Sequence, residues 1–88
     1  MFRMWGKTFK NSRMIQDTVI SIGDYSLSRT AMVFQALDEI CYQFDLGKPI
    51  WLETTIQDFK RHDKARFYQD NFIESIDFDF LEIQILEE

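Results

Sequence analysis

One amphipathic segment constrains the fold more than any other part of the chain: residues 28–47, SRTAMVFQALDEICYQFDLG. Its apolar residues recur at spacings of three and four, which places them along one side of a helix. Ser28 is a residue type preferred at a helix N-cap, and Gly47 is the type preferred just beyond a helix C-terminus. The pattern predicts one helix over residues 28–46 that lies across a second structural layer.

The N-terminal quarter of the chain predicts two strands joined by a tight turn. Residues 2–10 are extended in character, and residues 13–22 are rich in β-branched side chains. Asn11 and Ser12 lie between them, and Asn tolerates the positive φ that a hairpin turn needs. Gly6 follows a change of phase, so we expect a bulge there. Alternation divides the large apolar side chains of the first strand between its two faces: Phe2 and Met4 on one, Trp5 and Phe9 on the other.

A shorter helix is expected after the break at Pro49. Thr54 or Thr55 is suited to cap it, and Phe59 is expected to anchor it in the core. Trp51 precedes this helix. It is either a hydrophobic staple that packs into the core or an exposed contact for a partner, and we retain it as a candidate binding residue.

The last element, residues 72–86, alternates in the manner of a strand. Its alternation reverses phase between Phe80 and Leu81, which indicates a bulge, a sharp bend or a strand buried on both sides. The predicted order is therefore ββααβ. This order describes a two-layer α+β domain, with a three-stranded antiparallel sheet and two helices in one globular unit over residues 1–88.

Charge is distributed unevenly along the chain. The first thirteen residues contain four bases and no acid, whereas the last twenty-two contain seven acids and no base. Opposite charges on neighbouring strands contribute roughly a few tenths of a kcal/mol per pair. The asymmetry therefore predicts that the first and last strands are neighbours.

Aromatic residues are abundant, with nine Phe, three Tyr and two Trp among 88 residues. A domain of this size buries only roughly 60–65% of its unfolded surface. So many rings can fill its core and leave some for an interface. Because a small sheet with helices on one side has an open face, the surplus aromatics are expected to cover that face by dimerisation.

A basic cluster, FKRHDKARF, occupies residues 59–67. Cations in the last turns of a helix favour the negative end of its dipole, and we prefer that structural interpretation. The alternative is contact with a nucleic-acid backbone, although the formal net charge of the chain is -5. The candidate binding residues for that alternative are Lys60, Arg61, Lys64 and Arg66.

Catalysis is not indicated by the sequence. His62 is the only histidine, and neither paired histidines nor paired cysteines provide the spacing of a metal site. Cys41 lies on the apolar stripe of the long helix, where a thiol behaves as a small hydrophobe. A small hydrolase or nuclease centred on His62 stays open as the third function class, and no cofactor, catalytic residue or metal ligand is assigned.

The composition also indicates the cellular compartment of the protein. A single cysteine excludes an intramolecular disulfide framework and is typical of a reducing cytosol. No apolar run approaches the roughly 20 residues of a membrane span, and no secretion signal is evident. We therefore expect a cytoplasmic protein that acts through a protein partner or a second copy of itself rather than through a membrane.

Most of the chain resembles a family of small proteins from clostridial-type bacteria with no known activity. The resemblance is carried by EICYQFDLGKPIWL, DFKRHDKARF and QDNFIESIDFDFLEIQI. It implies a bacterial cytoplasmic source and assigns no site residue. The leading function expected from the sequence is a non-enzymatic interaction or regulatory protein.

Overall fold

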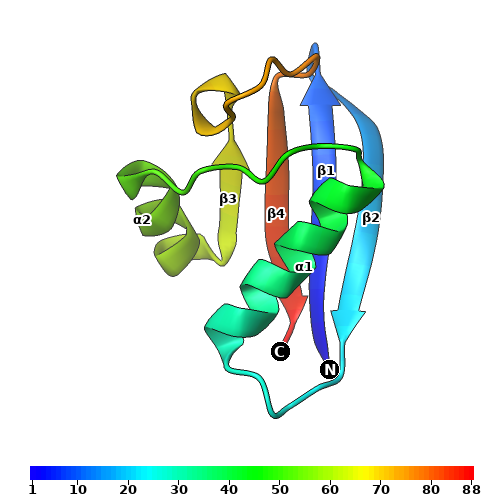
Figure 1. Ribbon diagram of the computed structural model, residues 1–88, viewed down its shortest axis with the longest axis vertical. Coiled ribbons are helices and arrows are strands. Elements are labelled where there is room, and N and C mark those ends of the chain that lie inside the picture. Colours follow the sequence, from blue (N-terminus) through cyan, green and yellow to red (C-terminus); the bar gives the residue numbers. More distant parts are fainter.

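The computed structural model describes residues 1–88 and contains four strands, two α-helices and one 3₁₀ turn (Figure 1). In chain order they are β1 (Phe2–Lys10), β2 (Arg13–Ile22), α1 (Arg29–Gln43), α2 (Glu53–His62), β3 (Lys64–Phe67), η1 (Gln69–Asn71) and β4 (Phe80–Glu87). Neither helix has the length and apolar content that crossing a membrane requires.

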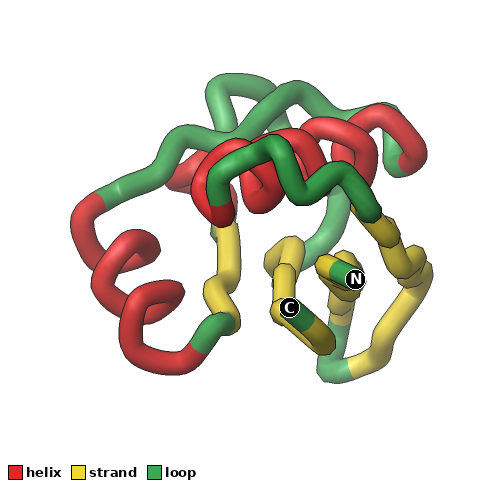
Figure 2. The backbone as a smooth tube through the Cα atoms, turned by 90° about the horizontal axis from the view of Figure 1, so that it is seen from below, coloured by secondary structure: helices red, strands yellow, loops and turns green.

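The strands form one antiparallel sheet in the order β2-β1-β4-β3. Figure 2 shows α1 and the long connections on one side of the sheet and α2 beside β3, while no helix lies on the opposite side. The α+β class and the two helices agree with the sequence prediction. The prediction of three strands is wrong, because β3 adds a fourth.

Strand β3 was expected to be the end of the second helix. Helix α2 instead ends at His62, where Asp63 adopts a left-handed conformation with φ 53° and turns the chain. The next four residues then alternate, with Ala65 and Phe67 buried and Lys64 and Arg66 exposed. Because a four-residue strand shows only two periods, its pattern is difficult to distinguish from a helix terminus in the sequence.

The predicted hairpin is confirmed. Asn11 and Ser12 both have positive φ, 53° and 66°, as a two-residue turn between twisted strands requires. The expected bulge at Gly6 is wrong, since the register of β1 shifts at Thr8/Phe9 and at Arg3/Met4. Gly6 instead allows close packing: a Cβ atom there would lie 2.6 Å from Cγ2 of Ile40 on α1.

Helix α1 covers the sheet with the predicted apolar stripe, and its buried residues are Val33, Ala36, Leu37, Ile40 and Cys41. The Ser28 hydroxyl accepts a hydrogen bond from the Ala31 amide at 3.1 Å, which confirms the N-cap. The C-terminal prediction is wrong, because Asp45 rather than Gly47 has positive φ. Gly47 instead donates its amide to the Glu74 carboxylate at 2.6 Å.

Helix α2 packs beside β3 through Phe59, which is buried as predicted. The expected threonine caps are wrong, since the helix begins at Glu53 and Leu52 occupies the N-cap position without a side-chain hydrogen bond. Thr55 is buried instead, and its hydroxyl accepts a hydrogen bond from the Asn71 amide at 3.1 Å. Asn71 thus connects α2 to the turn that follows β3.

The final strand is shorter than predicted and begins at Phe80, where the alternation changes phase. The preceding loop is held by Gln69, whose side chain donates to the Glu74 carbonyl at 2.7 Å and accepts from the Ile76 amide at 3.0 Å. The prediction that the first and last strands are neighbours in the sheet is confirmed, because β1 pairs with β4 along most of its length. Lys7 lies directly opposite Glu82 in this pairing.

Candidate interaction surface

The side of the sheet without helices carries a set of large and charged side chains, which we call the open face. Alternation along β1 directs Phe2 and Met4 into the core and the odd-numbered residues outward. The strand pairing then places outward residues of the other strands beside them. The open face includes Arg3, Trp5, Lys7, Phe9, Met14, Asp17, Val19, Ser21, Lys64, Arg66, Tyr68, Phe80, Glu82 and Gln84.

A row of charges crosses the middle of the open face. Asp17 on β2 is opposite Lys7 on β1, Lys7 is opposite Glu82 on β4, and Glu82 is opposite Arg66 on β3. The Lys7 Nζ atom lies 2.8 Å from Glu82 Oε2, and Arg66 Nε lies 2.9 Å from Glu82 Oε1. The row therefore alternates in sign across all four strands and sums to zero.

The two central members of this row are buried although no helix covers them. Lys7 is 7% exposed and Glu82 is 4% exposed. Burial raises the pKa of the Glu82 carboxyl, but the hydrogen bonds and charges of Lys7 and Arg66 together outweigh that effect, so its pKa is lowered. The Lys7 ammonium also lies 3.7 Å from the centre of the Trp5 ring, a cation–π contact. The charged centre is therefore internally satisfied.

Beside the charges lies a row of aromatic rings. Phe9 and Phe80 stack with their centroids 5.1 Å apart, and Tyr68 lies 5.6 Å from Phe80. The Arg66 guanidinium lies 4.5 Å from the centre of the Phe80 ring. Met14 is opposite Phe9 on the β2 side. The row thus consists of Met14 on β2, Phe9 on β1, Phe80 on β4 and Tyr68 directly after β3, and both of its outer members are about half exposed.

The predicted basic cluster is divided between two parts of the molecule. Lys60, Arg61 and the exposed His62 lie in the last turn of α2, whereas Lys64 and Arg66 lie on β3 and belong to the open face. Asp63 pairs with Arg29 at 2.8 Å rather than with a base of the cluster. The five basic residues of 59–67 therefore do not form one continuous patch.

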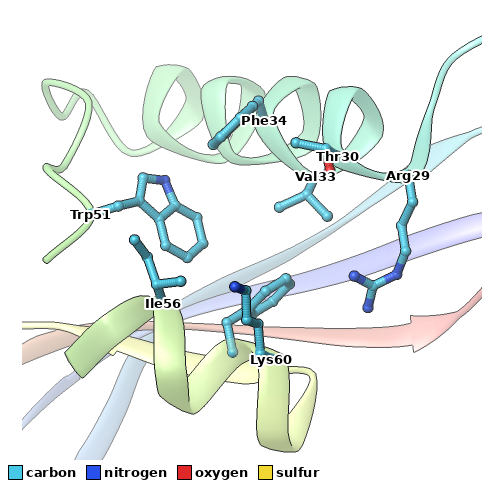
Figure 3. A pocket seen from close by; sticks show the side chains of 8 residues that line it. Arg29, Thr30, Val33, Phe34, Trp51, Ile56 and Lys60 are labelled. Atoms are coloured by element: carbon cyan, nitrogen blue, oxygen red, sulfur yellow. The ribbon is translucent and has the colours of Figure 1, made fainter. Parts of the chain in front are cut away.

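Trp51 lies between the two helices, beside a groove of about 300 Å³ (Figure 3). Its ring makes edge contacts with Phe34, Phe59 and Phe67 at centroid distances of 6.1, 5.5 and 5.0 Å. Figure 3 shows the Lys60 side chain beside this groove. Trp51 therefore packs against the core as a staple does, while part of its ring lines the groove.

Burial raises the pKa of the Cys41 thiol to about 12, which keeps it protonated and poorly nucleophilic at neutral pH. No group of three His, Cys, Asp or Glu side chains is arranged to hold a metal ion.

Sequence reasoning anticipated an open face with surplus aromatics, but it did not identify the residues that form it. Phe9 and Phe80 are 71 positions apart in the sequence and meet only through the β1–β4 register. Two sequence features could have identified them: the shared face of the odd-numbered residues of β1, and the charge complementarity of β1 and β4.

Comparison with protein-family models, curated proteins and solved structures gives no match to this chain.

Proposed function

We propose that this is a non-enzymatic cytoplasmic interaction protein that self-associates through the open face. The observation that carries the proposal is a sheet that α1 covers on one side and α2 flanks at its β3 edge, while its other side presents an aromatic row beside a neutral charge row. Exposed apolar groups rimmed by polar ones are typical of interaction sites. The single cysteine is a buried free thiol, which supports the cytoplasmic assignment.

A second copy of the chain suits this surface better than a strongly charged partner. The whole chain has a formal net charge of -5, so two copies repel each other over most orientations. The charge row of the open face has two acids and two bases and is electrically balanced. Association through this face therefore avoids the repulsion that other surfaces would impose.

The size of the open face supports a weak association. Four strands spaced about 4.8 Å apart and about seven residues long at about 3.3 Å each give roughly 450 Å² of flat area. A standard stable interface buries about 800 Å² per partner. We therefore expect an equilibrium between monomer and dimer that depends on protein concentration, rather than a permanent dimer.

Sedimentation equilibrium tests the proposal. The weight-average mass of the wild type should rise above the 10.6 kDa of one chain as concentration increases. Val19 is 40% exposed and lies opposite Trp5 on the open face. Val19→Lys should weaken the association at least tenfold, because it places an additional charge on that surface. Tyr42→Lys, at an 87% exposed position on α1, is the matched control and should leave the association unchanged.

Two results contradict the proposal. One is a wild-type mass that stays monomeric over the whole concentration range. The other is equal sensitivity to Val19→Lys and Tyr42→Lys, with circular dichroism showing both variants folded.

Binding of single-stranded nucleic acid is the alternative outcome, because aromatic rings beside Arg66 also suit base stacking. Fluorescence anisotropy with a labelled oligonucleotide tests it, using Lys64→Glu on the open face and Lys60→Glu on α2. Salt-sensitive binding that only Lys64→Glu abolishes, by a protein that sediments as a monomer, would replace self-association with nucleic-acid binding.

A further inference from the structure

We infer that the twofold axis of the dimer lies in the interface, parallel to the strands and over the gap between β1 and β4. This inference rests on the proposed self-association. The inference comes from the order of charges in the central row: Asp17, Lys7, Glu82 and Arg66. Reversing this order exchanges every acid for a base. A twofold axis at that position reverses the order in the second copy, so each charge faces its opposite.

The exposed residues at the two ends of the charge row, Asp17 and Arg66, form the contacts with the second copy. Lys7 and Glu82 are buried and already paired with each other. Arg66, whose side chain is 50% exposed, faces the partner's Asp17, and the same contact repeats on the other side of the axis. Asp17 is exposed and uses one carboxylate oxygen to accept the Trp5 indole hydrogen at 2.9 Å. Its other oxygen is available to a guanidinium from the second copy.

Other axes place like charges together. An axis perpendicular to the strands along the charge row puts Asp17 over the partner's Asp17 and Arg66 over the partner's Arg66. An axis parallel to the strands but centred on β1 puts Asp17 over the partner's Glu82. Like charges that face each other are destabilising, so the charge row selects both the direction and the position of the axis.

The aromatic row is compatible with the same axis. Reversing the order Met14, Phe9, Phe80, Tyr68 places Phe9 on the partner's Phe80 and Met14 on the partner's Tyr68. Aromatic pairs and sulfur–aromatic pairs are both favourable contacts. The geometry therefore gives each ring of the row an apolar partner in the second copy.

Sheet twist displaces these contacts only slightly. Packed sheets are rotated by about 30° relative to each other, and the outer strands lie roughly 7 Å from the axis. The resulting displacement along the strand is about one residue. Arg66 has a side chain long enough to accommodate this displacement, so the contact with the partner's Asp17 is retained.

Paramagnetic relaxation enhancement in mixed samples tests the axis. A nitroxide is attached through Ser21→Cys, an exposed β2 position opposite Arg3 that lies on the open face beyond the charge row and the aromatic row. The native Cys41 is buried and stays unlabelled. The spin-labelled chain carries no ¹⁵N and is mixed with an ¹⁵N-labelled wild-type chain, so any broadening arises between molecules. A label at Tyr42→Cys, on the helix side of the molecule, is the control.

We expect the Ser21→Cys label to broaden amides of β3 in the ¹⁵N chain, with the largest loss of intensity near Lys64. The β2 amides should lose less intensity than those of β3, because β2 and β3 are at opposite edges of the sheet. Broadening of β2 instead would overturn the axis and leave self-association standing. Absence of intermolecular broadening, together with a monomeric sedimentation mass, would overturn both. The Tyr42→Cys label should broaden no strand.

Discussion

Replacing Lys7 by Met should destabilise the fold strongly, because it leaves the buried Glu82 carboxylate without its closest cation. Lys7 Nζ lies 2.8 Å from Glu82, and both residues are less than a tenth exposed. Removing one partner of a buried ion pair costs about 3–5 kcal/mol. Arg66 remains at 2.9 Å, so we expect the lower end, about 3 kcal/mol. This is a large fraction of the roughly 4–13 kcal/mol that holds a domain of this size together.

Urea unfolding at several pH values measures this effect. The native pKa of Glu82 is lowered from its ordinary value of 4.5, so its contribution to stability is present above pH 4.5 and disappears as pH falls through the native pKa. In Lys7→Met, the pKa of Glu82 should be higher than in the wild type, because the hydrogen bond and charge of Lys7 no longer oppose the effect of burial. The acid-induced loss of stability that comes from this group should therefore be smaller or reversed in the variant.

The double variant Lys7→Met/Glu82→Leu is the control for loss of packing. Replacing both charges by apolar groups of similar size is often neutral, and the half-exposed Arg66 can turn to water. The double variant should therefore recover most of the stability that Lys7→Met loses. A cost of Lys7→Met below about 1 kcal/mol, or a double variant no more stable than the single one, would contradict a buried Glu82 carboxylate that depends on Lys7.

Three further predictions concern the helical side of the molecule. Phe59→Ala should cost about 3–5 kcal/mol in thermal or urea unfolding, and a fully stable variant would show that this ring does not anchor α2. Lys60→Ala and Arg61→Ala should each change the unfolding free energy by only about 0.3–1 kcal/mol, and about 1 M salt should remove most of that change. A larger loss of stability that resists salt would contradict a helix-dipole role for these residues. Gly6→Ala should destabilise by about 1–3 kcal/mol through contact with Ile40, and adding Ile40→Ala should cost less than the sum of the single changes if that contact is the cause.

The sequence predicted the parts of this fold that have long or chemically distinctive patterns. The β1–β2 hairpin follows from two long strand-like runs around Asn11 and Ser12, and the Ser28 cap marks the start of α1. The position of β4 beside β1 follows from complementary charge. β3 could not be recognised, because its four residues follow a helix directly and carry the same basic character as the helix end.

Errors in the predicted elements have local physical causes. The segment before Phe80 alternates in sequence but forms a loop, in which the Gln69 side chain bonds to the Glu74 carbonyl and the Ile76 amide. Asp45 takes the left-handed position expected for Gly47, since an aspartate also tolerates that conformation. The open face could be expected in general terms. Its two rows could not be expected, because they depend on the register of β1 with β4 and on the presence of β3.

A dilution series of ¹H–¹⁵N spectra tests the central claim, self-association through the open face, most directly. If two copies meet there, concentration-dependent shifts should be confined to residues of the four strands and to the Trp5 indole, whose ring lies on that face. The Trp51 indole, between the helices, should not shift and serves as the internal reference. Spectra that do not change with concentration, or shifts centred on Trp51 and α2, would contradict the account.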